Sequence, residues 1–598
     1  MADNDRTSAL HRKAGFLLLP SLAFIIAFLA YSQFFGVSIL EFDAVAHILS
    51  HAKPGPGTII EIFSQGHDRY LSTGYQYRPI QSIAWWAMLS LFGFDFAPMH
   101  MLNFLLHALN SVLVFFLAKK LLNDKKGFFA LFASVLFALH PVHINTLLFV
   151  SRLPEPLAIF FLLASLLSFI AFLEKKRPFL FALSVLCCFL GVFSKEAGSM
   201  IPAILFFYAL VFLKPDGISA HVKRCLRLCV PFFCTVLLYL LMMNISLGTV
   251  PRYIWELSGN RSQRLFAFTR MLFYPLDILK NDYFGSFYNF LNAQLADIFF
   301  IFYAALFTVV ALLHFSKKAG DKALLFLSTW LFSCMFVLAA YNLLPSWYMY
   351  TPAVPFSIIL ALFLQRSLSN CKSLLAHRRQ GPNAFRHGLF PIAKKPWPSN
   401  AVAVAITIFF LYLAFLSPLF TQYSQPWVAS GITKNFFSQA LASAQAIPPG
   451  NTIYLINCPE FLLVSDKGFT YEILLVNDAS LQAFLDFALP EKNFEVVSLT
   501  AVRLYSAELS QDQFALAREG DCGFVLWNSS LLKAFSYIPK TWKQKTGEAD
   551  LLRKDPLAVK ISGGLPQAAR IKIPQSLCAN SAVFFFDGHG IQEVGLGG

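Results

Sequence analysis

The chain has 598 residues, of which 57% are hydrophobic and 14% are charged, and it contains 66 phenylalanines. Soluble domains average roughly 45–50% apolar and about 25% charged residues, so this composition excludes an ordinary soluble protein and indicates a polytopic membrane protein. The formal net charge is +15. Most basic residues nevertheless stand in short loops between apolar runs, a pattern that orients a membrane protein and does not indicate nucleic-acid binding.

The first apolar run, residues 14–37, predicts a retained transmembrane helix, because it is too long for a signal-peptide core and lacks a convincing cleavage site. Directly after it, "SILEFDAVAH" places Glu41, Asp43 and His47 where the chain leaves the membrane. Spacing alone leaves two interpretations open. Both acids are solvated residues at a helix end, or one is a general base whose pKa is raised by partial desolvation.

Clusters of lysine and arginine determine the predicted topology, because such clusters concentrate on the cytoplasmic side of a membrane. The clusters lie at 119–126, 175–177, 214–227, 317–322 and 366–395. Eleven spans satisfy the alternation, with the N-terminus inside and everything after Gln422 outside. They are residues 15–36, 97–118, 127–143, 154–173, 178–193, 198–213, 229–247, 296–315, 323–342, 350–366 and 401–420.

Two apolar stretches, residues 80–92 and 264–280, do not fit this alternation. Trp85 and Trp86 in the first stretch are typical interface anchors, so we expect both stretches to lie in the outer membrane interface. Residues 38–96 then form a large first external loop.

Three cations fall at predicted external ends of spans, against the positive-inside expectation: Arg78 in "YQYRPI", Arg152 in "VSRLPEP" and Lys195 in "FSKEAG". One role is binding of an anionic group at the membrane surface, since the arginine fork suits phosphate. The other role is pairing with a carboxylate inside the bundle, such as Glu155 or Glu196, and it accounts for Lys195 about as well.

Histidines form two patterns. His100 and His107 in "HMLNFLLHALN" stand two helical turns apart with Asn103 on the same stripe. This spacing is wide for a helical metal pair and favours hydrogen-bonded packing residues. His140 and His143 in "HPVH" resemble a ligand pair, but the proline between them predicts a turn at a span end, and zinc usually takes three or four protein ligands.

After Gln422 the pattern changes to short apolar runs, "NTIYLINC", "FEVVSL", "CGFVLW" and "SAVFFFDG", with a helix-like stretch "SLQAFLDFAL" among them. Residues 423–598 are therefore predicted to form a soluble periplasmic domain of the α/β or α+β class. Cys458, Cys522 and Cys578 allow one disulfide of unspecified pairing. Residues 366–400 are predicted to be a basic, Gly/Pro-rich cytoplasmic linker.

Five signals follow one another in a specific order: "YRPI", the H-x-x-N-x-x-x-H pattern, "HPVH", "SRLPEPLA" and "FSKEAG". With the acids after the first span, this order resembles the tetratricopeptide-containing O-mannosyltransferase family and its bacterial relatives, which are polytopic GT-C glycosyltransferases. The resemblance covers most of residues 15–366. The tail shows no 34-residue helical period, so it does not resemble the tetratricopeptide array of that family.

The resemblance implies a GT-C-like transmembrane catalytic domain over residues 1–422, with an acidic motif beside a groove for a polyprenyl-phosphate-linked sugar. By this resemblance Asp43 is the base that deprotonates an acceptor hydroxyl, and Glu41 is its neighbour. Contacts to the donor phosphate or the substrate are assigned to Arg78, Arg152, Lys195, Glu196, His100, His107, His143 and Tyr348. No metal is expected, and Glu41 and Asp43 are the ligands of the less favoured metal-dependent alternative.

The predicted function is transfer of a hexose, with inversion, from a lipid-phosphate donor to a hydroxyl of a periplasmic protein, lipid or glycan. The predicted location is a bacterial inner membrane, with the N-terminus cytoplasmic and the tail periplasmic. The alternatives are a transporter or flippase of lipid-linked sugars and a membrane-anchored assembly protein that works through its tail. Transporters commonly carry an inverted repeat, and none is visible in the sequence.

Overall fold

The structure is a computed structural model of the full chain. It describes residues 18–37, 58–64, 77–93, 97–215, 217–247, 322–339, 346–379 and 424–456, single positions between these segments, and in the C-terminal part 458–466, 469–474, 476–498, 501–505, 514–518, 523–528, 558–559, 568–572, 581–586 and 591–594.

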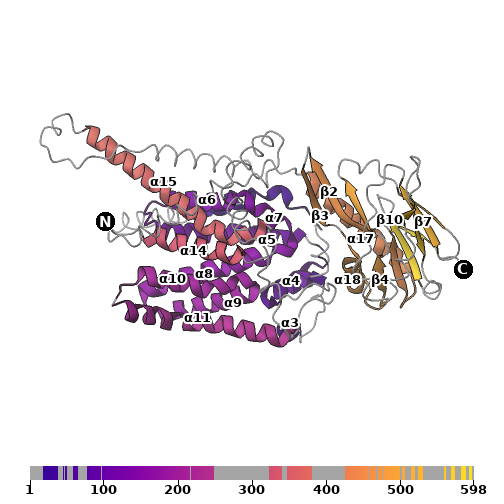
Figure 1. The fold of residues 1–598 in the computed structure, drawn as a ribbon, viewed down its shortest axis with the longest axis horizontal. Helices are drawn as coiled ribbons and strands as arrows, with labels where there is room; N and C mark the ends of the chain where they lie inside the picture. The colour runs from indigo at the N-terminus through magenta and orange to yellow at the C-terminus, as the bar shows by residue number, and fades with distance from the viewer. Residues whose placement is uncertain are drawn as a thin grey trace, which may run out of the picture.

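The N-terminal part is a bundle of apolar helices (Figure 1). The longer helices are Leu18–Leu29, α4 (Pro79–Phe92), α5 (Ala97–Leu121), α6 (Phe128–Leu139), α8 (Pro154–Lys175), α9 (Pro178–Ser194), α10 (Ile201–Phe212), α11 (Ile218–Leu247), α14 (Lys322–Ala339) and α15 (Tyr350–Arg379). Short helical elements are η1 (Ser32–Phe34), α3 (Thr58–Ser64), η2 (Pro141–His143), α7 (Ile144–Leu148), η3 (Val150–Arg152), η4 (Glu196–Met200) and η7 (Ser346–Met349).

Four segments in the described part of the chain are long and apolar enough to cross a membrane by length and composition: Ala97–Leu121, Val150–Lys175, Ile218–Leu247 and Trp347–Arg366. The prediction of a largely helical polytopic membrane protein is confirmed, while the count of eleven spans stays a prediction. Residues 296–315 and 401–420, which are two of those spans, and the apolar stretch 264–280 lie outside the described residues.

Several helix ends differ from the predicted spans for local reasons. The span predicted over 127–143 stops at Leu139, because His140 precedes Pro141 and adopts an extended backbone, φ −64° and ψ 126°. The span predicted over 198–213 begins at Ile201, since residues 196–200 form the 3₁₀ turn η4.

Two helices are longer than expected. Helix α11 begins at Ile218, eleven residues before its predicted start at 229, and passes through Pro231. Helix α15 continues to Arg379, so the first part of the segment predicted as a linker, 366–400, is helical. Figure 1 shows α15 extending beyond the other helices of the bundle.

Small side chains hold α8 and α9 together. The Ser165 hydroxyl donates to the Ser184 carbonyl at 2.8 Å, and the Ser184 hydroxyl donates to the Ser165 carbonyl at 2.8 Å. Small and hydroxyl-bearing residues allow close helix packing where lipid supplies no hydrophobic driving force. Two turns further along α9, Gly198 of η4 lies against Gly191, and a Cβ on Gly198 would stand 2.2 Å from the Gly191 carbonyl oxygen.

The C-terminal part combines helices with strands, as the sequence predicts. Its best described sheet has the order β11-β10-β1-β4, in which β1 (Thr452–Ile456) runs parallel to β10 (Ser581–Phe586) and to β4 (Glu495–Ser498). Strand β11 (Ile591–Val594) is antiparallel to β10. The helices are α17 (Ser424–Ala446) and α18 (Asp478–Ala488).

Two further sheets complete the described strands of this domain. Their orders are β3-β2-β5 and β6-β7-β9-β8. The strands are β2 (Cys458–Asp466), β3 (Phe469–Leu474), β5 (Ala501–Tyr505), β6 (Phe514–Arg518), β7 (Gly523–Asn528), β8 (Ala558–Val559) and β9 (Ala568–Lys572).

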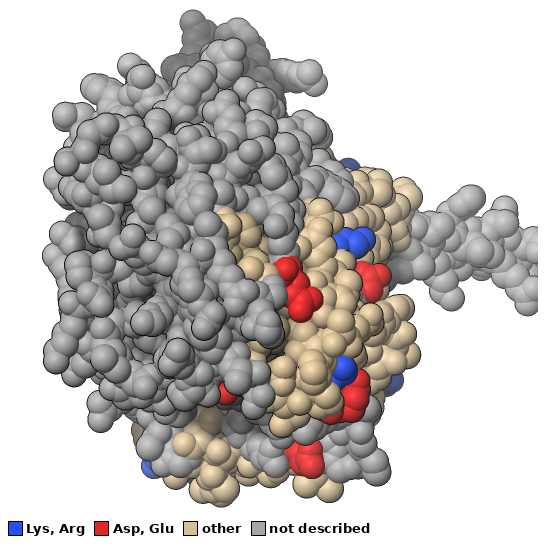
Figure 2. Space-filling view, turned by 90° about the vertical axis from the view of Figure 1, so that its right-hand side faces the viewer, with Lys and Arg blue, Asp and Glu red and all other residues tan. Residues whose placement is uncertain are grey.

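The C-terminal domain lies beyond the end of the bundle at which α3, α4 and α7 are found (Figure 1). Figure 2 looks onto the molecule from the side of the C-terminal domain, and a few acidic and basic side chains are scattered over the mostly uncharged described surface. Of the three cysteines predicted to be external, Cys458 is buried, and its Sγ donates to the Val476 carbonyl at 3.3 Å. The other two, Cys522 and Cys578, lie outside the described residues.

Candidate functional site

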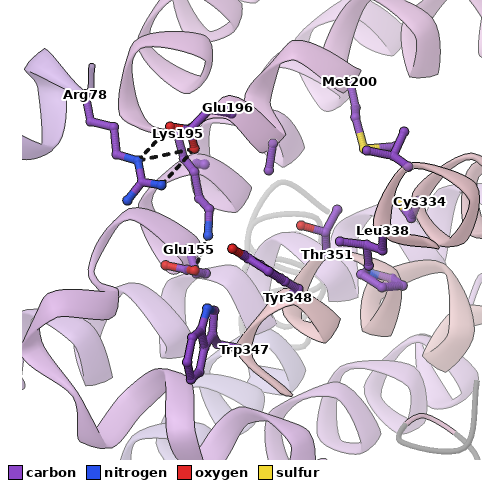
Figure 3. Close-up of a pocket in the computed structure, with 14 residues that line it drawn as sticks. Arg78, Glu155, Lys195, Glu196, Met200, Cys334, Leu338, Trp347, Tyr348 and Thr351 are labelled. Carbon is purple, nitrogen blue, oxygen red and sulfur yellow. Dashed lines mark hydrogen bonds and ion pairs between the residues drawn. The ribbon is translucent and has the colours of Figure 1, made fainter. Parts of the chain in front are cut away.

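A pocket with one charged and one apolar wall lies among the helix ends of the bundle (Figure 3). We call it the charged pocket. The charged wall consists of Arg78, Glu155, Lys195 and Glu196. Trp347 and Tyr348 of η7 lie beside this wall, and α14 and η4 supply apolar lining that includes Met200, Cys334 and Leu338.

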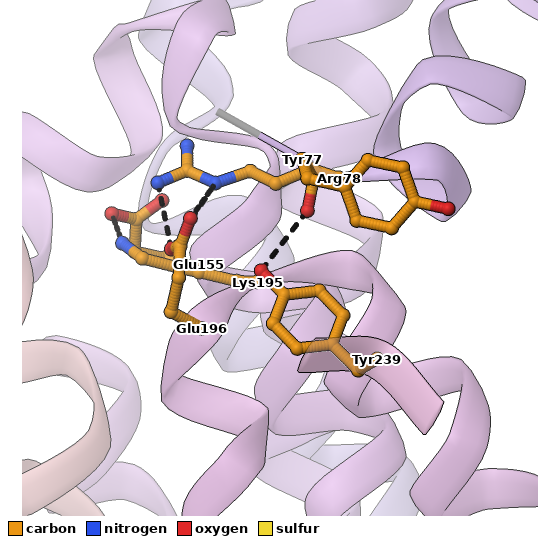
Figure 4. Close-up of polar contacts among 6 residues, drawn as sticks. All are labelled: Tyr77, Arg78, Glu155, Lys195, Glu196 and Tyr239. Atoms are coloured by element: carbon orange, nitrogen blue, oxygen red, sulfur yellow. Dashed lines mark hydrogen bonds and ion pairs between the residues drawn. The ribbon is translucent and has the colours of Figure 1, made fainter. Parts of the chain in front are cut away.

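The start of α4 places Arg78 in the charged pocket. Pro79 occupies the first helical position, which suits its fixed φ and missing N–H. The Arg78 carbonyl accepts from the Ser82 amide at 3.1 Å. The preceding residue is also held, since the Tyr77 hydroxyl donates to a carbonyl of α3 at 2.7 Å and the Tyr239 hydroxyl donates to the Tyr77 carbonyl at 3.1 Å (Figure 4).

Arg78 and Glu196 form a two-pronged ion pair across the charged pocket (Figures 3 and 4). Nε of Arg78 donates to both carboxylate oxygens, at 3.1 and 3.2 Å, and a terminal nitrogen donates to Oε2 at 2.8 Å. The side chains are 15% and 13% exposed. Both oxygens of Glu196 are therefore engaged by the guanidinium, a geometry that fixes orientation as well as charge.

Lys195 and Glu155 form a second, more deeply buried pair. Lys195 ends α9 in an extended conformation, and its ammonium donates to Oε1 of Glu155 in the first turn of α8. Both side chains are 6% exposed. Burial lowers the pKa of the Lys195 ammonium, and the adjacent Glu155 carboxylate opposes this shift. Oε2 of Glu155 is buried without a hydrogen-bond partner among the described residues.

The η7 turn brings two aromatic rings against the cations of this region. The Arg152 guanidinium lies 3.8 Å from the centre of the Trp347 ring, and the Lys195 ammonium lies 4.9 Å from the centre of the Tyr348 ring. Cation–π contacts of this kind contribute about 0.5–2 kcal/mol, most where water is excluded. Arg152 is thus attached to the charged pocket through Trp347.

The histidines form a different site. We call His107, Asn110, His143 and Tyr350 the His107 cluster. Nε2 of His107 lies 2.9 Å from the Ala138 carbonyl and must donate to it, so Nδ1 accepts from the Tyr350 hydroxyl at 2.8 Å. Asn110 donates to the same hydroxyl at 3.2 Å and to the Pro156 carbonyl at 2.8 Å.

Neighbouring polar residues also hold the helices together by hydrogen bonds and ring contacts. Asn103 donates to the Phe149 carbonyl at 3.1 Å, and Nε2 of His140 donates to the Leu272 carbonyl at 3.1 Å. The His143 ring centre lies 4.5 Å from that of Tyr350. These contacts anchor the short helical elements η2, α7 and η3 between α6 and α8, which agrees with the prediction of packing residues for His107.

The structure separates the predicted site residues into three groups. Arg78, Lys195, Glu196 and Tyr348 line the charged pocket, and Arg152 contacts it through Trp347. His100, His107 and His143 are buried and do not line it. Glu41 and Asp43 lie outside the described residues, as does His47.

Sequence reasoning missed Trp347, Cys334 and Met200 as lining residues and named Glu155 only as a pairing partner. No local signal marks the first three. Within the described residues, no group of three or more metal-ligating side chains is close enough to hold an ion.

Comparison with known proteins supports the predicted resemblance to O-mannosyltransferases for part of the chain. Residues 79–246 match the family model described as dolichyl-phosphate-mannose-protein mannosyltransferase. Protein O-mannosyl-transferase F38B6.6 of Caenorhabditis elegans is 30% identical over 190 residues, which make up 31% of this chain and 26% of the relative. The resemblance to O-mannosyltransferases is confirmed over this part of the chain. The match covers about a quarter of the length of that curated relative. The range matched by the family model contains Arg152, Glu155, Lys195 and Glu196.

Two solved structures resemble the chain weakly. ArnT from Cupriavidus metallidurans bound to undecaprenyl phosphate is 12% identical, with a TM-score of 0.41, over 84% of this chain and 96% of that one. The oligosaccharyltransferase of Archaeoglobus fulgidus in the apo form is 14% identical, with a TM-score of 0.43, over 74% of this chain and 62% of that one. TM-scores of this size do not establish a shared fold.

Proposed function

We propose that this protein is a membrane glycosyltransferase that moves a hexose from a polyprenyl-phosphate-linked donor to an acceptor hydroxyl with inversion. The observation that carries the proposal is the charged pocket, whose cations Arg78 and Lys195 lie opposite apolar lining from α14. A lipid-linked sugar has the same division, since its phosphate is anionic and its polyprenyl chain is apolar. The family match over residues 79–246 supports the same class of reaction.

In the proposed reaction Asp43 takes the proton of the acceptor hydroxyl. The acceptor oxygen forms a bond to the anomeric carbon while the bond from that carbon to the phosphate oxygen breaks. The electron pair of the broken bond leaves with the polyprenyl phosphate, and attack from the opposite side inverts the configuration. Glu41 is proposed as the supporting neighbour of the base.

Arg78 and Lys195 would stabilise the phosphate as its charge grows. Electrostatic stabilisation of this kind is strong in a site that excludes water. Both cations are already paired with carboxylates, so the lipid phosphate would have to share or replace Glu196 on the Arg78 fork. Arg152 and the His107 cluster would then act by supporting the walls of the pocket.

We further propose that the enzyme resides in a bacterial inner membrane and that the C-terminal domain lies on the periplasmic side. In Figure 1 this domain is adjacent to the bundle end that carries α4. An acceptor protein, lipid or glycan bound by the domain would therefore be delivered on the side where the first external loop is predicted.

Two measurements test the function. The first is mass spectrometry of periplasmic proteins, lipids and glycans from cells with and without the intact protein, with a hexose-sized mass expected only when it is present. The second is release of undecaprenyl phosphate from undecaprenyl-phosphate-linked mannose, glucose or galactose by the purified chain with a periplasmic extract. Absence of both signals overturns the proposal.

The base is tested by Asp43→Asn with Glu41→Gln as its matched control. A general base typically contributes about 10²–10⁴-fold to the rate. We expect a loss of this size in Asp43→Asn with unchanged binding of the donor lipid, and a smaller loss in Glu41→Gln. Full turnover in Asp43→Asn would contradict the assignment.

A further inference from the structure

Glu155 differs from the other carboxylate of the charged pocket. Both oxygens of Glu196 accept hydrogen bonds from Arg78. Glu155 gives only Oε1 to Lys195, and its Oε2 is buried without a hydrogen-bond partner among the described residues. The side chain is 6% exposed and lines the pocket (Figure 3).

A buried carboxylate oxygen without a partner is costly. Leaving a buried polar atom unsatisfied costs about 1–3 kcal/mol, and more for a charged group. The great majority of buried polar atoms in folded proteins have a partner, so an exception at a pocket wall indicates a group supplied from outside the chain.

The chemistry of Oε2 restricts that group. An ionised carboxylate is an acceptor only, so its partner must be a donor. A phosphate oxygen would be repelled by the like charge. Lys195 already balances the charge of Glu155, which favours a neutral O–H donor over a second ammonium. A sugar hydroxyl has this property.

We propose that Oε2 of Glu155 accepts a hydrogen bond from a hydroxyl of the sugar on the lipid-linked donor, which makes Glu155 a specificity-determining residue. The inference rests on the proposed function for the identity of the ligand. It divides the pocket into a phosphate side at Arg78 and Lys195 and a sugar side at Glu155. Lys195 connects the two sides, because it belongs to the phosphate side and its ammonium donates to Glu155 on the sugar side.

The substitution Glu155→Gln tests this assignment with little change in shape. The ammonium of Lys195 requires an acceptor, so the amide oxygen should turn toward it. The amide NH₂ then occupies the place of Oε2, and an acceptor on the pocket wall becomes a donor. The sugar hydroxyl loses its partner, while the phosphate side keeps Arg78 and Lys195.

The measurement is equilibrium binding to the full-length chain in detergent, with two kinds of probe. One is undecaprenyl phosphate, and the other is undecaprenyl phosphate linked to mannose, glucose or galactose. We expect at least one sugar-bearing lipid to bind wild type more tightly than the bare lipid phosphate. In Glu155→Gln its Kd should rise about tenfold relative to the Kd of undecaprenyl phosphate, which corresponds to roughly 1.4 kcal/mol.

Glu196→Gln is the matched control, because it removes the other carboxylate of the pocket, whose oxygens are both used by Arg78. It should change the Kd of undecaprenyl phosphate and of the sugar-bearing lipid by the same factor. The ratio of the two Kd values is therefore altered by Glu155→Gln alone.

Deoxy donors provide a test whose main measurement uses the wild-type protein and needs no variant to fold. Removal of one particular hydroxyl from the sugar should weaken binding to wild type about tenfold, and the same removal should have little effect in Glu155→Gln. If every deoxy donor binds wild type like its parent, or if no sugar-bearing lipid binds more tightly than undecaprenyl phosphate, the inference is overturned. An equal rise of both Kd values in Glu155→Gln also overturns it.

These outcomes are distinct from failure of the proposed function. A chain that binds the sugar through Glu155 but releases no undecaprenyl phosphate would retain the inference and lose the transferase. A chain that transfers the sugar with an unchanged Kd ratio in Glu155→Gln would retain the transferase and lose the inference.

Discussion

The charged pocket and the His107 cluster are both buried and polar and both contain atoms without a hydrogen-bond partner in the described part of the chain, yet only in the charged pocket does such an atom belong to a residue that lines the cavity. In the His107 cluster both ring nitrogens of His107 and the hydroxyl of Tyr350 are bonded within the protein. Oδ1 of Asn110 and the ring nitrogens of His143 have no hydrogen-bond partner among the described residues, but neither residue lines the charged pocket. In the charged pocket Glu155 keeps an oxygen that no described residue binds. Burial and polarity alone therefore do not identify a functional residue, whereas an unused bonding capacity at a pocket wall does.

The comparison predicts that changes in the charged pocket alter both stability and ligand binding, whereas changes in the His107 cluster alter stability alone. The largest expected effect comes from Lys195→Met, which leaves the Glu155 carboxylate buried without a counter-charge. Breaking a buried pair in this way costs about 3–5 kcal/mol. Thermal unfolding in detergent should show this loss.

The double variant Lys195→Met/Glu155→Met is the control for Lys195→Met. Replacing both members of a buried pair by apolar residues is often neutral or stabilising. Recovery of stability without recovery of undecaprenyl phosphate binding is expected. No loss of stability in Lys195→Met would contradict the counter-charge role.

Gly198→Ala should have the next largest effect, because its Cβ would stand 2.2 Å from the Gly191 carbonyl oxygen. The η4 turn would have to move away from α9, and forced repacking of this kind costs about 1–3 kcal/mol. Since Glu196 begins this turn and Lys195 directly precedes it, donor binding should weaken together with the melting temperature. Gly431→Ala, where no atom lies within 4 Å of the added Cβ, is the matched control.

Arg78→Lys tests the two-pronged pair with Glu196. Lysine keeps the positive charge but loses the planar fork, so the substitution is not conservative at this position. We expect undecaprenyl phosphate to bind about tenfold more weakly, or roughly 1.4 kcal/mol, with a smaller change in stability. Unchanged affinity would show that the fork has no part in binding.

Tyr350→Phe should have the smallest effect, and it tests whether the His107 cluster takes part in ligand binding. It removes one hydroxyl that bonds His107 and Asn110. Buried hydrogen bonds between membrane helices contribute about 0.6–2 kcal/mol. The melting temperature should fall while the Kd for undecaprenyl phosphate stays within twofold of wild type, and Tyr348→Phe in the charged pocket is the comparison. A large loss of affinity in Tyr350→Phe would place the His107 cluster in the binding site.

Much of the architecture could be predicted because its cause is local. The helical period of "SLQAFLDFAL" predicts α18, and the alternation of short apolar runs with turn residues predicts β1 and β10; all three are present. The end of α6 at Leu139 also has a local cause in Pro141. The continuation of α15 to Arg379 was missed because the apolar stripe ends earlier, although the helix does not.

Part of the candidate site could also be predicted, because cations at external span ends oppose the positive-inside tendency. That signal found Arg78 and Lys195, which line the charged pocket. It could not assign their partners. Arg78 pairs with Glu196 across 118 residues of sequence, and Lys195 pairs with Glu155 across 40.

The sequence by itself determined the membrane class, the mixed C-terminal domain and which polar residues require an explanation. These follow from composition, periodicity and charge asymmetry, which can be read along the chain without knowledge of which distant residues are in contact. Only the tertiary structure decided that Lys195 pairs with Glu155 and not with its neighbour Glu196, and that His107 bonds Tyr350. Such pairings depend on how α8, α9 and α15 pack, because a hydrogen bond requires two atoms within about 3 Å and spacing along the chain does not supply that distance.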